Sequence, residues 1–269
     1  MNAILFRQMM KVHMKTFMNY AFGSAFYILL IFWLYPSIGK NVDAIDVLVD
    51  AMPEGVGRAF GLSGFGTAEA FISGEYYGLI LILLLAIVCV QLSTQLVAKL
   101  VDQGSMAYLL STPTTRAKVA LTQALVLVTG LFLIMGVTTL AGFAGNAWFL
   151  AGDYEFNTSR FIEMNVGAFL LFFAVGGIAF LVSSLSNDEK KALGISGFIT
   201  FGFFSLDLVG KFSDKTEWMR SFSIFSLYQP GEIINGNVNL GLSFTILAVI
   251  GLVSFGLAVL LFRKRDLPL

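Results

Sequence analysis

The chain has 269 residues, of which 57% are hydrophobic and 13% charged, with 17 basic and 17 acidic side chains. Soluble domains are about half apolar and about a quarter charged, so this composition excludes an ordinary soluble protein and indicates an integral membrane protein. A net charge of zero gives no basic field to attract nucleic acid, and the single cysteine, Cys89, excludes an internal disulfide.

An amphipathic helix is predicted at the N-terminus, over residues 2–16. Arg7, Lys11 and Lys15 recur at every fourth position and form one basic stripe, with apolar residues on the other side. Basic amphipathic helices of this kind lie in the interface of a membrane rather than across it. We therefore expect this helix to rest on membrane lipid just before the first membrane span.

Six apolar runs follow, each close to the length of about 20 residues that a helix needs to cross a bilayer. We predict membrane spans at residues 17–35, 76–98, 119–143, 165–185, 192–209 and 242–262. The expected fold class is an all-α integral membrane protein, with residues 1–269 forming a single transmembrane domain.

The distribution of basic residues predicts the orientation of these spans. Six spans place both termini on one side, together with the loop between spans two and three. The basic residues on that side are Arg7, Lys11, Lys15, Lys99, Arg116, Lys118, Lys190, Lys191, Arg263, Lys264 and Arg265, and six others lie on the opposite side. Cytoplasmic loops carry the excess of Lys and Arg, so we expect a multi-pass membrane protein with both termini cytoplasmic.

The fifth predicted span is diluted by small residues, among them Gly194, Gly197 and Thr200. Because small residues let helices approach closely in lipid, we expect this span to pack against protein. A loosening of the helix without a packing role is the alternative. Near its outer end, Asp207 precedes Lys211 by one turn, which predicts an interfacial ion pair; a contact to substrate or to an ion is the alternative.

The loop between spans two and three, residues 99–118, is the longest polar segment on the predicted cytoplasmic side. It contains, in order, Asp102, Gly104, Met106, Tyr108, Leu109, Leu110, Pro113 and Arg116. Its apolar residues predict a short amphipathic helix, and Pro113 disfavours helix at the residue before it. A shorter loop would suffice to join two spans, so this one is expected to present its helix to a partner in the water.

A polar patch lies at the inner end of the second span, where Gln91, Thr94 and Gln95 interrupt the apolar residues. These side chains either line a cavity or satisfy polar groups of neighbouring helices, and the sequence leaves both possibilities open.

Motifs for chemistry are missing from the sequence. It contains no P-loop motif, and one histidine with one cysteine is too few for the usual zinc site. The predicted spans hold almost no ionisable residue, so a proton relay is not expected and the energy for any transport should come from another subunit. We therefore expect no catalytic residue, no metal and no cofactor on this chain.

Three short motifs resemble those of one membrane-protein family. The loop has an acid at Asp102, then Gly104-Ser105, Leu109-Leu110-Ser111-Thr112-Pro113 and Arg116. The others are Ser226-Leu227-Tyr228-Gln229-Pro230-Gly231 before the last span and Phe262-Arg263-Lys264-Arg265-Asp266-Leu267 after it. With the N-terminal helix and six spans, they resemble the type 2 ABC-transporter permease family over essentially the whole chain. Ser105 and Ala107 depart from it, standing where the family often has a threonine and an acid.

The resemblance implies a membrane subunit that works with a separate ABC ATP-binding subunit, which holds ATP and Mg²⁺, and with a second permease copy or a paralogue. The 99–118 loop would be the cytoplasmic coupling helix that docks on the ATPase. Its apolar anchors would be Met106, Tyr108, Leu109 and Leu110, and its polar rim would include Asp102 and Arg116. Spans one and five would form the permease interface, which agrees with the small residues Gly194, Gly197 and Thr200. An outer re-entrant segment, near residues 221–236, would close the exit.

The function expected from this resemblance is ATP-driven export of an amphipathic or lipid-like compound, such as an antimicrobial peptide, an antibiotic or a lipid. One alternative is an ABC-type complex that serves sensing or maturation. The other is an unrelated membrane scaffold or enzyme subunit. An ATP-binding protein encoded beside this chain would separate the last alternative from the first two.

Overall fold

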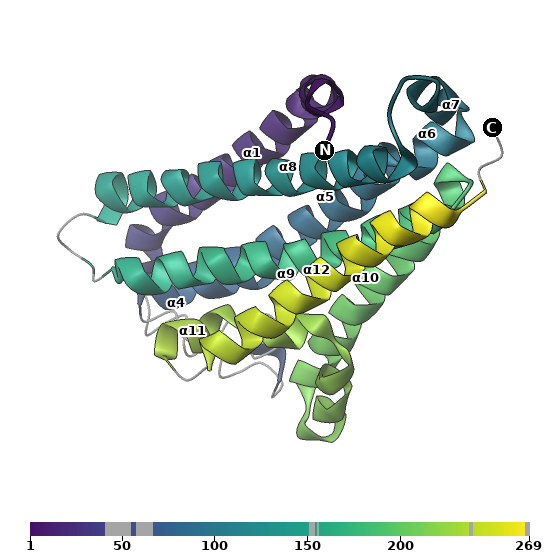
Figure 1. The fold of residues 1–269 in the computed structure, drawn as a ribbon. Coiled ribbons are helices and arrows are strands. Elements are labelled where there is room, and N and C mark those ends of the chain that lie inside the picture. Colours follow the sequence, from purple (N-terminus) through teal and green to yellow (C-terminus); the bar gives the residue numbers. More distant parts are fainter. Residues whose placement is uncertain (41–54, 58–66, 151–153, 155, 237–238, 267–269) are drawn as a thin grey trace.

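Six helical segments long and apolar enough to cross a membrane form the body of the protein (Figure 1). The computed structural model describes the whole chain except residues 41–54, 58–66, 151–153, 155, 237–238 and 267–269. The described residues form helices and no strand, which confirms the all-α fold, and the six long apolar helices equal the predicted number of membrane spans.

The six segments have the following bounds. They are α1 (Ala3–Gly39); a run of α4 (Ala68–Ile72), the π-helix η1 (Ser73–Ile80), α5 (Leu81–Leu96) and α6 (Ala98–Asp102); α8 (Arg116–Gly145) with the π-helix η2 (Asn146–Leu150); α9 (Thr158–Leu185); α10 (Glu189–Phe212); and α12 (Leu240–Lys264). In the part of the chain that the structure describes, four shorter helices lie between them: α7 (Ser105–Leu110), the 3-10 helices η3 (Asp214–Phe222) and η4 (Ile224–Leu227), and α11 (Pro230–Asn235).

The predicted N-terminal helix and the first span are one uninterrupted helix, α1. Its Asn2 cap accepts hydrogen bonds from the backbone N–H groups of Ile4 and Leu5, and no glycine or proline falls between Ala3 and Phe22 to break the helix. Figure 1 shows the first turns of α1 turned away from the line of its remaining length. The basic stripe of this part is exposed, and its position at a membrane surface stays a prediction.

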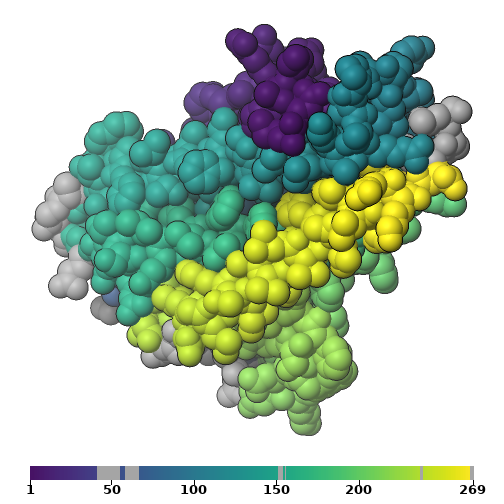
Figure 2. All heavy atoms as spheres, in the orientation of Figure 1, coloured from purple at the N-terminus to yellow at the C-terminus, as the bar shows by residue number. Residues whose placement is uncertain are grey.

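The start of α1, the end of α12 and α7 share one end of the bundle, and α4 and α11 lie at the other (Figure 1). Asn2 ties the N-terminus to the start of α8, because its backbone N–H and its side-chain amide donate to Thr122 Oγ1 and Thr114 Oγ1, both at 2.9 Å. In Figure 2 the start of α1 and the α6–α7 region protrude side by side at this end. We call it the α7 end below.

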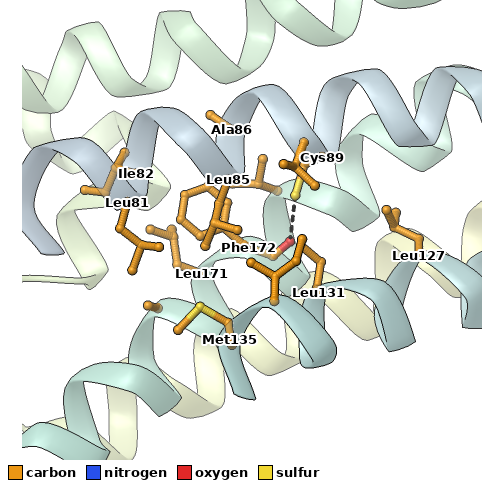
Figure 3. Packing of buried hydrophobic residues seen from close by; sticks show 14 of the residues in the cluster. Leu81, Ile82, Leu85, Ala86, Cys89, Leu127, Leu131, Met135, Leu171 and Phe172 are labelled. Carbon is orange, nitrogen blue, oxygen red and sulfur yellow. Dashed lines mark hydrogen bonds between the residues drawn. The ribbon is translucent and has the colours of Figure 1, made fainter. Parts of the chain in front are cut away.

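The core is centred on α5 and α9. In Figure 3 Leu85 and Cys89 of α5 face Phe172 of α9 and Leu131 of α8, and all four are buried. The Cys89 thiol donates to the Phe172 carbonyl at 3.5 Å, so it acts as a small packing residue. The spans are buried to different extents. In the most apolar 18-residue stretch of the Ala68–Asp102 segment, 67% is buried inside the chain, whereas the corresponding stretch of α10 is 22% buried.

Close contact between α1 and α8 depends on glycines of α8. A Cβ added at Gly145 would lie 2.8 Å from the ring of Phe32, and Gly130 leaves still less room. A Cβ added at Gly130 of α8 would lie 2.0 Å from the ring of Phe17, a fully buried residue of α1. Small residues allow this approach in a membrane bundle, where close van der Waals packing holds helices together.

The segment between α10 and α12 folds back on the bundle at the end opposite α7. Phe225 of η4 is buried and lies 6.3 and 5.8 Å, centroid to centroid, from the rings of Phe172 and Phe204. Ser223 Oγ also donates to the Phe203 carbonyl at 2.6 Å. The predicted re-entrant segment thus packs against α9 and α10, while its depth in a membrane stays a prediction.

Candidate functional site

The short helix predicted between spans two and three is present as α7. It follows α6 after a turn at Gly104, whose positive φ of 70° is easily adopted only by glycine. Met106 is fully buried in the core of its own chain, whereas the Tyr108 side chain is 80% exposed. Leu109 and Leu110 are half-buried against the same core. Of the four predicted anchors, Tyr108 therefore presents the largest free surface, and Met106 instead fixes α7 to the bundle.

A break in the second span sets the direction in which α6 leaves the bundle. The α-helix stops at Val97, where Ser183 of α9 inserts its hydroxyl into the backbone ladder. Ser183 Oγ donates to the Ser93 carbonyl at 2.7 Å and accepts from the Ala98 N–H at 3.0 Å. A side chain inserted in this way is a common cause of helix kinks. Nothing in the sequence indicates this role of Ser183, since an isolated serine in an apolar span carries no signal of its partner.

Asp102, predicted as part of a polar rim, bonds within its own chain. Its Oδ2 accepts from the backbone N–H of Glu189, the first residue of α10, at 3.2 Å. Lys99 lies on the same side, with its Nζ 3.4 Å from Glu189 Oε1. We call residues 102–116, from the end of α6 to the start of α8, the α7 region. Its first residue, Asp102, is thus attached to the turn between α9 and α10.

Arg116 likewise bonds within the chain, because its Nη1 donates to the Arg265 carbonyl at 2.5 Å. The Arg265 guanidinium in turn donates to the carbonyls of Ser184 and Ser186 at 2.6 and 3.1 Å, and to Asn187 Oδ1. Partial burial lowers the pKa of Arg265 from its usual value, but arginine remains charged in proteins. From the sequence, Arg265 was one of three consecutive basic residues after the last span, and nothing indicated which of them folds back.

The C-terminal end of α7 is capped by its own hydroxyls. Ser111 Oγ donates to the Tyr108 carbonyl at 2.8 Å and Thr112 Oγ1 to the Leu109 carbonyl at 2.6 Å, which satisfies carbonyls that a helix end leaves unpaired. Pro113 follows and is exposed. The helix ends at Leu110, before the proline, as the sequence predicted.

The polar patch at the inner end of the second span bonds with helix partners. Gln91 Oε1 accepts from the Tyr20 hydroxyl of α1 at 2.9 Å, and the buried Thr94 donates to the Val90 carbonyl of its own helix at 2.9 Å. Gln95 is half-buried. For Gln91 and Thr94, these bonds favour the helix-packing alternative over the cavity.

The three small residues of α10 divide between two faces of the helix. Gly194 is exposed and Gly197 half-buried, and a Cβ added at either would meet no atom within 4 Å. Thr200 instead lies on the buried stripe that also carries Ser196 and Asp207. The two glycines are free to face another chain, but Thr200 packs against its own.

The predicted ion pair at the far end of α10 is present and is larger than expected. The Asp207 carboxylate is 5% exposed and lies 2.6 Å from Lys211 Nζ and 3.3 Å from Arg220 Nε. Arg220 comes from η3, so the pair connects α10 to the folded-back segment.

No group of three or more His, Cys, Asp or Glu side chains in the described ranges is arranged to hold a metal ion. The features at the α7 end are backbone caps and an exposed aromatic side chain, which suit a contact surface rather than a reaction.

Among the described residues, six helices are long and apolar enough to cross a membrane, which defines a multi-pass membrane protein. The chain matches the family model described as ABC-2 family transporter protein over residues 3–267, so it belongs to that family. No curated protein gives a significant match. Membership makes this chain the membrane subunit of an ABC transporter rather than its catalytic subunit, and it argues against the alternative of an unrelated scaffold or enzyme subunit.

Proposed function

We propose that this chain, as a single domain of residues 1–269, is the permease subunit of an ATP-driven exporter of the bacterial plasma membrane. It forms the translocation path and takes its energy from a separate ABC subunit that binds ATP and Mg²⁺. Its cargo is an amphipathic or lipid-like compound, such as an antimicrobial peptide, an antibiotic or a lipid, because the aromatic, weakly charged spans suit such a molecule. Both termini and α7 lie in the cytoplasm.

The observation that carries this proposal is the exposed Tyr108 on α7. A large aromatic side chain that is 80% exposed, on a helix fixed by the buried Met106, is a typical anchor for a partner protein. Aromatic residues dominate the energy of such interfaces, so Tyr108 is the centre of the proposed ATPase contact, flanked by Leu109 and Leu110.

We further propose that α10, together with α1, forms the interface with a second permease copy or a paralogue. Gly194 and Gly197 have open space around them, and Phe198, the residue after Gly197 in the same helix, is 82% exposed. Small residues beside a protruding ring allow two helices to approach closely in lipid.

The test is co-purification of the native ATPase with Tyr108→Ala in mild detergent. Loss of a central aromatic anchor should weaken the complex by about 2 kcal/mol, which is about 30-fold in Kd. Trp218→Ala serves as the control, because Trp218 is 60% exposed on η3 at the opposite end. Leu109→Asp and Leu110→Asp should also release the ATPase. Because both leucines are half-buried against the core, these substitutions also disturb the packing of α7 and are harder to interpret.

Normal recovery of the ATPase with Tyr108→Ala, Leu109→Asp and Leu110→Asp would contradict the assignment of α7 as the coupling helix. The absence of any ATPase from the wild-type preparation would contradict the proposed function itself.

A further inference from the structure

The turn between α9 and α10 is held on one side by a residue from the C-terminal tail. Arg265 donates to the carbonyls of Ser184 and Ser186 and to the Asn187 side chain. The last carbonyls of a helix have no partner within the helix, and its C-terminal end carries partial negative charge. Arg265 thus caps α9 with both hydrogen bonds and a positive charge.

The same turn is held on its other side by α6. Asp102 accepts from the Glu189 N–H, and Lys99 forms an ion pair with the Glu189 side chain. The first N–H groups of a helix are unpaired and its N-terminal end carries partial positive charge, so the Asp102 carboxylate complements the start of α10. Two charged side chains from other segments thus cap this turn: Arg265 at the end of α9 and Asp102 at the start of α10.

Arg116 connects these two attachments. It is the first residue of α8, where the α7 region ends, and its Nη1 donates to the carbonyl of Arg265. The α7 region is therefore attached to the α9–α10 turn at both of its ends, directly through Asp102 and indirectly through Arg116 and Arg265.

We propose that Asp102, Arg116 and Arg265 form a clasp that couples movement of α7 to α10. Arg265 is the positioning residue of this clasp, because the planar guanidinium reaches three acceptors at once, which a lysine ammonium on a flexible chain does not do as rigidly. A force applied to α7 reaches the start of α10 through the clasp. The clasp is a property of this chain alone, whereas the source of the force rests on the proposed function.

Hydrogen exchange of the isolated permease in lipid nanodiscs tests the clasp. Arg265→Ala removes three charge-assisted bonds, so the backbone amides of residues 186–192 should exchange about tenfold faster than in the wild type. Arg265→Lys should give an intermediate rate. Lys264→Ala is the matched control, since Lys264 is the exposed neighbour and should leave the rate unchanged. Equal rates in Arg265→Ala and Lys264→Ala would overturn the clasp.

The coupling role is tested on the complex with the co-purifying ATPase, by comparing exchange with and without ATP. In the wild type, ATP should change the exchange of α7 and of the first turns of α10. In Arg265→Ala the ATPase should stay bound and the α7 response should persist, while the α10 response falls by about half or more. An α10 response of wild-type size would overturn the coupling role. If no ATPase co-purifies with the wild type, the proposed function and the coupling role fall together, and the exchange of the isolated permease still decides whether the clasp exists.

Discussion

Helices α9 and α10 follow one another in the chain and are both apolar, glycine-containing spans, yet they differ in what surrounds them. The most apolar window of α9 is 61% buried within the chain, and that of α10 only 22%. A Cβ added at Gly177 of α9 would lie 3.0 Å from the Gly251 carbonyl of α12, whereas one added at Gly197 of α10 would meet nothing within 4 Å. Similar composition therefore serves a core helix in one case and a surface helix in the other.

The difference also shows how α10 is attached. Its fully buried residues form one stripe, which consists of Ala192, Ser196, Thr200, Asp207 and Gly210. Beside this stripe, Phe203 and Phe204 contact the segment that folds back on the bundle. The remaining face must be covered by lipid or by another protein. We expect changes that disturb packing to cost stability around most of α9, but around α10 only on this stripe and at Phe203 and Phe204 beside it.

Asp207→Ala should have the largest effect, because Asp207 lies on the buried stripe of α10. Removing the buried carboxylate leaves Lys211 and Arg220 without their shared partner, which should lower the free energy of unfolding by about 3 kcal/mol. Equilibrium unfolding in mixed micelles with increasing dodecyl sulfate would measure it. Glu217→Ala, at an exposed acid on η3, is the control. A loss no larger than that of the control would show that the ion pair does not attach η3 to α10.

Leucine substitutions at the two glycines sharpen the comparison directly. Gly177→Leu forces a side chain against the α12 backbone and should cost about 2 kcal/mol of unfolding free energy. Gly197→Leu should leave the free energy of unfolding unchanged, because space is open around that position. If α10 contacts a second copy, the same change should lower the yield of cross-linked dimer. Equal destabilisation by both substitutions would contradict the assignment of α9 to the core and α10 to the surface.

Two neighbouring serines of α9 should give the smallest change in the free energy of unfolding. Ser183→Ala leaves the Ala98 N–H and the Ser93 carbonyl without their shared partner and should cost about 1 kcal/mol. Ser184→Ala should cost almost nothing, because the buried Ser184 hydroxyl has no hydrogen-bond partner among the described residues. Melting curves of the purified variants would separate the two, and a Ser184→Ala loss as large as that of Ser183→Ala would refute the role given to Ser183.

Sequence patterns were informative where the cause of a structure is local. Runs of about 20 apolar residues fixed the spans, and α7 follows from a short apolar stretch between Gly104 and Pro113. Partners of polar groups were harder to predict, because they come from distant segments. For Asp102 and Arg116 the contact with an ATPase stays a prediction, and the bonds that each makes within its own chain were not predicted.

The sequence by itself determined that this is a six-span helical membrane protein of the type 2 ABC permease kind, since hydropathy, run length and short motifs are properties of the chain alone. Only the tertiary structure decided which of two apolar spans is buried, why the helix of the second span breaks at Val97, and which basic residue of the tail caps α9. Those features depend on contacts between residues about 80 or more positions apart, such as Arg265 with Ser184, and no local pattern records them.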